Sequence, residues 1–269
     1  MRRSNTPLAV VALLAGCAAV PTPPTPQDAA RAAFEVAHDT FEGGNYLEAV
    51  REFQQVRTRH PYSTWATLAE LRLADCQFEL GKYLEAVEAY RSFIRFHPHH
   101  DRVVYAQFRI GESYVREMPE DWFFMPPAYE KDQASTRDAV RALEDFLAAR
   151  GSSEYGDRAR ELLRRCRRRL ADHEMYVAQF YLQQREPRAA ASRLERLADS
   201  FPDIGLAEEA LFLLGRVYLT LEDPAKAGVA LRRLVEDYPE HAHVPAARRL
   251  LEGLPAAPPP KPAPSQSES

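Results

Sequence analysis

The sequence Gly-Lys-Tyr-Leu-Glu-Ala-Val-Glu-Ala-Tyr-Arg-Ser-Phe-Ile-Arg-Phe-His-Pro at residues 81–98 contains a turn, an amphipathic helix and a proline stop. The same design occurs 37 residues earlier, at residues 44–61, and returns at residues 223–239. A fixed period of this size predicts a repeat architecture. Each unit is a helical hairpin that cannot bury its apolar face alone, so we expect the hairpins to stack on one another.

Composition favours an all-helical protein. The chain has 269 residues, of which 45% are hydrophobic and 28% are charged, and its net charge is -4. Glycine is scarce, at 11 residues, and long segments lack the alternation that is typical of strands. The 21 prolines cluster near both ends and at the repeat junctions, where they end helices. The acidic balance argues against a nucleic-acid partner, which would require a basic surface.

The first residues have the pattern of an export signal. Residues 1–16 hold two arginines and an apolar run, Leu8–Ala15, that is far shorter than the ~20 residues needed to cross a bilayer. The run ends in Leu14-Ala15-Gly16-Cys17, which resembles a bacterial lipobox. In such signals cleavage follows Gly16, and Cys17 receives acyl chains such as palmitate that hold the protein at a membrane. The alternative is a plain secretory signal with a chance cysteine.

The sequence around the cysteines predicts location and redox state. No acid follows Cys17, and by resemblance to lipoprotein sorting rules this predicts the outer membrane, with the protein on the periplasmic side. Residues 17–27 would form the lipidated cysteine and a proline-rich tether. Cys76 and Cys166 lie in helical stretches 90 residues apart. We expect two buried free thiols, with a periplasmic disulfide as the alternative.

Five repeat units are expected within one helical domain, residues 28–254. Each has a small residue in its first helix, which lets the two helices approach closely, and bulkier apolar residues that fill the remaining space. The expected units are about 30–61, 67–98, 104–150, 171–202 and 208–239.

This template resembles the tetratricopeptide repeat. The resemblance implies an all-α, right-handed superhelical solenoid of five helical hairpins. Residues 244–254 would form a C-terminal capping helix, which an end repeat requires. The Pro/Ala/Ser-rich segment 255–269 would be a disordered tail.

Unit three carries an insertion at residues 118–133 that is rich in proline and aromatic residues. Its four aromatics are Trp122, Phe123, Phe124 and Tyr129. Two interpretations remain open: the insertion packs back onto the solenoid as a plug, or it contacts a partner directly.

Motifs for catalysis or for a bound cofactor are not found. The sequence has no His-Glu-x-x-His, Gly-x-Ser-x-Gly, phosphate-binding glycine loop or Cys-x-x-Cys, so we expect neither an enzyme nor a cofactor. The three histidines within residues 97–100 could bind a metal ion, but they lie at a turn between repeats and are expected to cap helices. Residues 158–169 hold seven arginines. A solvated helix face is the default interpretation, and an acidic protein partner or lipid phosphates the alternative.

The first helices of such a solenoid line a groove that suits an extended or helical peptide. We expect about half of its apolar positions, Phe34 and Phe108 especially, to belong to the core between helices instead. The candidate groove residues are Phe34, His38, Phe41, Leu71, Asp75, Phe78 and Phe108.

Three further blocks resemble the BamD family, also called ComL or YfiO. They are residues 93–100, followed by Tyr105-Ala106; residues 132–137, after the double phenylalanine of the insertion; and residues 169–181. With the lipobox, the resemblance covers about residues 17–240 in the right order. It implies an outer-membrane lipoprotein of the β-barrel assembly machinery.

The resemblance also implies partners and a docking site. The N-terminal repeats of this family are thought to receive targeting segments of unfolded outer-membrane proteins. Its C-terminal repeats dock the POTRA domains of a BamA-like barrel subunit, beside other lipoproteins of the machinery. The family's docking arginine falls on Arg193, and we expect Arg188 and Tyr181 to contribute. In place of the family's frequent Gly-x-Tyr turn this chain has Glu186-Pro187-Arg188, where Pro187 suits the first position of a helix. A competing interpretation is a pilotin-like repeat lipoprotein that escorts secretin subunits.

Overall fold

The computed structural model describes residues 25–119 and 128–255. Within these ranges every regular element is helical. The helices are α1 (Pro26–Glu42), α2 (Tyr46–Arg59), α3 (Thr64–Glu79), α4 (Tyr83–Phe96), α5 (Val103–Glu117), the short 3-10 helix η1 (Ala128–Glu130), α6 (Ala134–Arg150), α7 (Gly156–Gln183), α8 (Pro187–Ser200), α9 (Ala207–Thr220), α10 (Pro224–Asp237) and α11 (Val244–Glu252).

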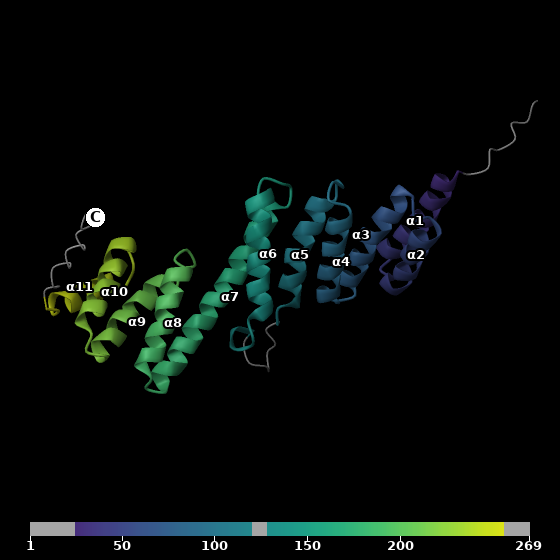
Figure 1. The fold of residues 1–269 in the computed structure, drawn as a ribbon. Coiled ribbons are helices and arrows are strands. Elements are labelled where there is room, and N and C mark those ends of the chain that lie inside the picture. Colours follow the sequence, from purple (N-terminus) through teal and green to yellow (C-terminus); the bar gives the residue numbers. More distant parts are fainter. Residues whose placement is uncertain (1–24, 120–127, 256–269) are drawn as a thin grey trace, which may run out of the picture.

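The helices form an elongated stack in which each packs mainly on the helix before it and the helix after it (Figure 1). Consecutive antiparallel pairs make up the five expected hairpins, and α11 packs on α10 at the C-terminal end. The expected all-α solenoid with a closing helix is confirmed. None of the helices in the described part of the chain is long and apolar enough to cross a bilayer.

Proline and polar side chains set the ends of the helices. The second helices α2, α4, α8 and α10 all stop at a residue that precedes a proline, and its N–H still donates to the carbonyl four residues back. These residues are His60, His97, Phe201 and Tyr238. The predicted capping role of His97 is thereby confirmed. Pro187 begins α8 as expected, because its missing N–H is not needed in the first turn.

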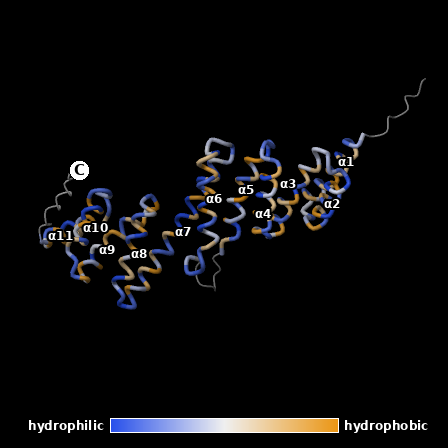
Figure 2. The backbone as a smooth tube through the Cα atoms, in the orientation of Figure 1, coloured by the Kyte–Doolittle hydropathy of each residue, from blue (hydrophilic) through white to orange (hydrophobic). Residues whose placement is uncertain are grey.

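Apolar and polar residues are interspersed along each helix (Figure 2). The buried apolar side chains form four successive clusters along the stack of hairpins. Helices α3, α5 and α7 each contribute to two adjacent clusters. Close approach within a hairpin depends on small residues: a Cβ placed on Gly111 would lie 2.7 Å from Leu143 Cδ2. Cys76 and Cys166 are buried free thiols, as expected.

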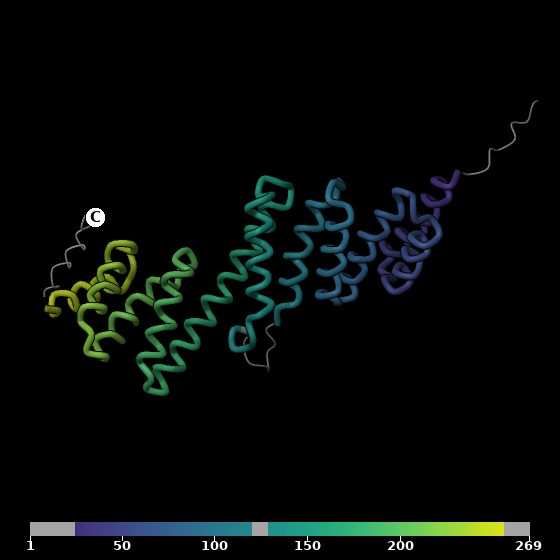
Figure 3. Tube along the Cα trace, in the orientation of Figure 1, coloured from purple at the N-terminus to yellow at the C-terminus, as the bar shows by residue number. Residues whose placement is uncertain are grey.

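Helix α7 departs from the repeat pattern. It runs for 28 residues as one unbroken helix, so the arginine-rich segment and the first helix of the fourth hairpin are continuous (Figure 3). Neither glycine nor proline interrupts residues 157–183, and the sequence therefore offers no stop between them. Its first half packs on α5 and α6 and its second half on α8. The two ends of the solenoid are joined through this helix.

Candidate functional site

Arg193, the expected docking residue, lies on α8 facing α7. Its Nη1 is 3.2 Å from Glu174 Oε2, and Arg196 Nη1 is 3.2 Å from the other oxygen, Oε1. The Glu174 side chain is only 11% exposed, whereas that of Arg193 is 29% exposed. A nearly buried carboxylate therefore fixes the direction of a guanidinium that still reaches the surface.

The other two expected docking residues lie nearer the turn between α7 and α8. Tyr181 lies two turns after Glu174 on α7, with its ring 5.8 Å from that of the exposed Phe180. Arg188 is exposed and lines a cleft of about 310 Å³ together with Glu195 and Tyr218.

The turn before α8 has the same left-handed backbone conformation as the turns before α2 and α4, but a residue other than glycine adopts it. Gly44 and Gly81 have φ of 78° and 74° before α2 and α4, and Arg185 takes φ 61° at the same place before α8. A left-handed conformation is unfavourable for a residue with a Cβ, so this turn is strained.

The structure buries five of the seven candidate groove residues. These are Phe34, Leu71, Asp75, Phe78 and Phe108. Burial of Phe34 and Phe108 was expected. Leu71, Asp75 and Phe78 are buried as well, so fewer residues remain as candidates to line the groove. Only Phe41 and His38 remain partly exposed. The sequence pattern alone does not distinguish a groove residue from a core residue, because both kinds of residue lie on the same side of the first helix of a hairpin.

A row of aromatic and arginine side chains nevertheless crosses α1, α3 and α5 with the period of the repeat. Phe41 lies 5.3 Å from Tyr46 and 5.7 Å from the guanidinium of Arg72. One period later in the chain, Phe78 lies 5.3 Å from Tyr83 and 3.7 Å from the guanidinium of Arg109. Neither arginine was among the predicted site residues. Their 37-residue spacing in the sequence is the signal that would have found them.

Asp75 is the centre of a buried hydrogen-bond network. It is 1% exposed and accepts hydrogen bonds from Tyr90 (2.6 Å), Tyr105 (2.8 Å) and Arg72 (2.9 Å). Arg109 joins the network by donating to the Tyr90 hydroxyl at 3.0 Å. Burial, followed by the charge of Asp75, raises the pKa of Tyr90 and that of Tyr105 well above their usual value. The expected groove residue Asp75 is therefore a structural anion that ties α3 to α4 and α5.

The insertion is anchored to α7 at both of its described ends. His173 Nδ1 contacts the Tyr129 carbonyl oxygen, and the Arg169 guanidinium donates to that of Pro119. The Tyr129 ring also lies 5.5 Å from the Tyr176 ring. Trp122, Phe123 and Phe124 lie outside the described residues. His173 and Glu174 are adjacent, so the contacts of α7 with the insertion and with Arg193, the expected docking residue, lie one residue apart.

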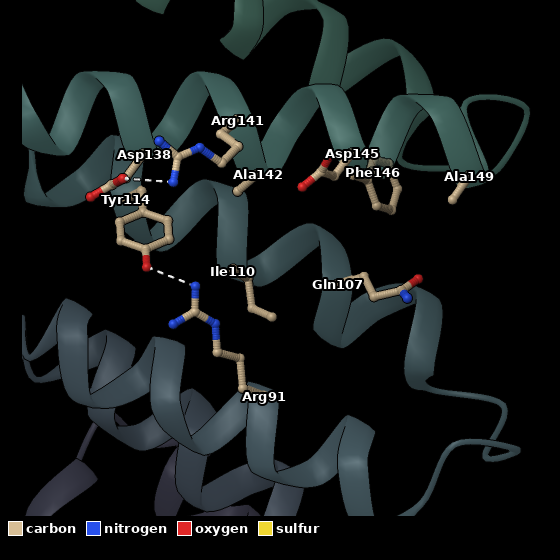
Figure 4. Close-up of a pocket in the computed structure, with 10 residues that line it drawn as sticks. All are labelled: Arg91, Gln107, Ile110, Tyr114, Asp138, Arg141, Ala142, Asp145, Phe146 and Ala149. Atoms are coloured by element: carbon tan, nitrogen blue, oxygen red, sulfur yellow. Dashed lines mark hydrogen bonds and ion pairs between the residues drawn. The ribbon is translucent and has the colours of Figure 1, made fainter.

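A separate crevice of about 250 Å³ lies between α4, α5 and α6, with Ile110 and Phe146 among its lining (Figure 4). Its arginines have partners nearby: Arg91 donates to the Tyr114 hydroxyl at 3.0 Å, and Arg141 faces Asp138 at 3.9 Å. Charge within this crevice is balanced.

Metal-binding geometry is absent from the part of the chain that the structure describes, where no three His, Cys, Asp or Glu side chains converge. His97 instead contacts Glu70, with Nε2 2.8 Å from Oε2.

The fold defines a tetratricopeptide-like solenoid of helical hairpins. Residues 26–231 match the YfiO family, described as outer membrane lipoprotein, and the chain belongs to this family. The protein is therefore a non-enzymatic outer membrane lipoprotein, as expected. Its lipobox and Cys17 lie outside the described residues.

Similar proteins carry a consistent name. The chain is 28% identical to "Outer membrane protein assembly factor BamD" of Caulobacter vibrioides, over 82% of this chain and 72% of that protein. It is 26% identical to the protein of the same name in Neisseria meningitidis serogroup B, over 76% of this chain and 77% of the other.

Solved tetratricopeptide structures align at low identity. A thermophilic TPR protein of Thermus thermophilus has a TM-score of 0.34 at 15% identity, covering 83% of this chain and 99% of that one. The TPR2AB domain of yeast Sti1, in a pHSP90 complex, has a TM-score of 0.41 at 11% identity, covering 84% of this chain and 85% of that one.

Proposed function

We propose that this lipoprotein is a scaffold of the machinery that assembles outer-membrane β-barrels. The observation that carries the proposal is its similarity, over 82% of the chain, to a relative named as an outer membrane protein assembly factor. A solenoid of helical hairpins supports such a role, because it offers extended surfaces to several partners at once. Cys17 would carry the lipid that holds the scaffold to the membrane on the periplasmic side, beside the machinery's other lipoproteins.

The α7–α8 hairpin is the proposed docking site for the POTRA domains of a BamA-like barrel subunit. Arg193 supports this assignment because Glu174 pre-orients its guanidinium while leaving part of it accessible. A guanidinium held in place loses little conformational entropy when a carboxylate of the partner binds it. Tyr181 and Arg188 would extend the contact toward the α7–α8 turn.

Substitution of Arg193 by glutamate tests this site. We expect Arg193→Glu to weaken binding of the purified POTRA domains about tenfold to a hundredfold, since it replaces an attractive charge at the interface by a repulsive one. Arg196→Glu is the matched control, because Arg196 contacts the same Glu174 at the same distance. Equal loss in both variants, or unchanged affinity in Arg193→Glu, would remove Arg193 from the docking site.

The N-terminal hairpins are the proposed site for targeting segments of unfolded outer-membrane proteins. Phe41 is the best-placed groove residue, since it is partly exposed and lies against Tyr46 and Arg72. An aromatic ring beside a guanidinium favours peptides that carry aromatic and polar groups together.

Phe41→Ala should reduce the affinity for peptides ending in an aromatic residue by about fivefold to tenfold, measured by fluorescence anisotropy. Phe96→Ala is the control, because Phe96 is 66% exposed and lies at the end of α4. Phe78→Ala is less informative alone, since Phe78 is buried and its loss would also weaken the core. Equal binding by Phe41→Ala and wild type would exclude Phe41 from the groove.

A further inference from the structure

A groove of about 410 Å³ lies between α9 and α11, at the C-terminal end of the stack (Figure 1). Each helix contributes one face, because the lining residues are spaced three or four apart along it. The side chains from α9 are Phe212, Arg216 and Leu219, and those from α11 are Ala246, Arg249 and Leu250. The groove, called the C-terminal groove below, therefore combines apolar side chains with two guanidinium groups.

The α9 residues of this groove occupy the positions that the repeat template predicts for binding. Aligned on the closing prolines of the second and fifth units, they correspond to Leu71, Asp75 and Phe78. Those three side chains are buried, and the two apolar ones share a cluster with the next first helix, α5. The three side chains of α9 are partly or fully exposed. The next helix here, α11, has only nine residues, whereas α9 has 14, so part of α9 is left uncovered.

The two arginines of the C-terminal groove have no carboxylate partner. Neither Arg216 nor Arg249 forms an ion pair with a residue in the described ranges, and no carboxylate is among the described lining residues. The Arg216 guanidinium lies 5.9 Å from the centre of the Phe212 ring, which stacks on His243 at 4.4 Å. Residues 256–269, which are outside the described ranges, hold one lysine and one glutamate and so add no net side-chain charge.

We propose that the C-terminal groove binds an extended segment of a partner polypeptide in which acidic and large apolar side chains alternate. Guanidinium groups form paired hydrogen bonds with carboxylates, and arginine clusters are a recurring means of recognising acidic motifs. Phe212 and the leucines beside it offer apolar contacts for the neighbouring side chains of such a segment. This surface is additional to the proposed barrel-assembly contacts and uses neither Arg193 nor Phe41.

Two other occupants fit the groove less well. The chain's own segment 256–269 contains alanine and proline but no larger apolar residue, and it has a single acid. A membrane presents phosphates in a plane, whereas a groove between two helices admits a single extended chain more readily. Charge and apolar lining together therefore favour a separate acidic polypeptide.

The test compares three fluorescein-labelled peptides with blocked ends. The parent alternates glutamate with leucine, one twin has glutamine for glutamate, and the other has serine for leucine. Full-length lipoprotein in mild detergent is titrated by fluorescence anisotropy. Wild type should bind the parent about tenfold more tightly than either twin, and added salt should remove its preference over the glutamine twin. Arg216→Gln with Arg249→Gln should remove the same preference.

A second double variant, Arg232→Gln with Arg248→Gln, is the matched control. It removes the same two charges from exposed positions on α10 and α11 that do not line the groove. This variant should retain the preference for glutamate. A chain that ends at Pro255 should retain it too, and loss of binding in that chain would assign the peptide site to residues 256–269.

Three results would overturn the proposal: no preference for glutamate in wild type, an equal loss in the control variant, or an unchanged preference in the groove variant. Loss of binding to phosphatidylglycerol vesicles in the groove variant, with the peptide preference intact, would assign the arginines to lipid. Circular dichroism of each variant identifies misfolding. Binding of the POTRA domains to the same variants reports on the proposed docking role separately, so either proposal can fail while the other stands.

Discussion

At the scale of single residues, the protein places the buried carboxylate of Asp75 where its own helix, α3, and the neighbouring helices α4 and α5 supply hydrogen-bond donors. Two tyrosine hydroxyls and one arginine donate to its carboxylate. A buried charge is tolerated only when its hydrogen bonds are complete, and removing it leaves its donors without a partner. The N-terminal hairpins are therefore held together by a specific network as well as by apolar packing.

Asp75→Ala should lower the free energy of unfolding by about 3 to 5 kcal/mol, because the hydroxyls of Tyr90 and Tyr105 and the guanidinium of Arg72 all lose their common acceptor. Urea denaturation is the measurement. Glu88→Ala, which breaks only the exposed pair with Arg91, should cost less than about 1 kcal/mol. A loss below about 1 kcal/mol for Asp75→Ala would show that the network adds little to stability.

The two buried thiols give stability a pH dependence of known sign. Burial raises the pKa of Cys76 from 9.0 to about 12 and that of Cys166 to about 11. Because the folded pKa values are raised, the stabilisation from keeping each thiol protonated is complete below about pH 9, and it is lost as pH rises from there through about 11 for Cys166 and about 12 for Cys76. Relative to the variant with both cysteines changed to alanine, wild type should lose about 1.4 kcal/mol per pH unit for each thiol. Parallel stability curves for the two proteins would contradict this.

At the scale of elements, close packing within a hairpin is set by single glycines. A Cβ on Gly215 of α9 would lie 2.6 Å from Leu231 of α10, which is fully buried and cannot move aside. A Cβ on Gly228 would instead meet Arg232 at 3.1 Å, and that side chain is exposed and flexible.

The two positions form a matched pair of alanine substitutions. Gly215→Ala should destabilise by about 1 to 3 kcal/mol through overpacking. Gly228→Ala should be neutral or stabilise by up to about 1 kcal/mol, because alanine favours the helix. Thermal unfolding of both variants measures the contrast, and equal shifts in the two would contradict the packing argument.

The helices and turns could be predicted well from the sequence, because the residues that begin and end them lie within or next to each helix in the chain. Prolines that follow His60 and His97, and the period between Gly44 and Gly81, are readable without tertiary contacts. What could not be predicted depends on which helix faces which. The pairing of Glu174 with Arg193 spans a turn and two helices, and Phe78 looks like a groove residue until α5 covers it.

At the scale of the whole molecule, α7 is the structural link between the N-terminal and C-terminal halves of the solenoid. Its first half shares a cluster with α5 and α6, and its second half contributes to the cluster that extends to α11. Arg167 strengthens the junction by reaching Asp203, at 2.5 Å, and the Ser200 carbonyl beyond α8. The relative placement of the two halves therefore depends on the continuity of one helix.

A proline in the middle of α7 tests this dependence. Leu170→Pro removes a backbone hydrogen bond and kinks the helix, at a cost of about 3 kcal/mol or more. We expect a changed radius of gyration in small-angle X-ray scattering, with most helical circular dichroism retained. Leu170→Ala removes the same side chain without bending the helix and should scatter like wild type. Identical scattering from the two variants would show that other contacts fix the halves.

Affinity purification of the lipidated protein from mild detergent, followed by mass spectrometry, tests the central claim most directly. Parallel purification of Arg193→Glu ties the result to the α7–α8 hairpin. The account predicts that wild type recovers a large outer-membrane barrel protein with POTRA domains and that the variant recovers much less of it. Recovery of a secretin in its place would contradict the assembly role and assign the protein to the pilotin-like lipoproteins.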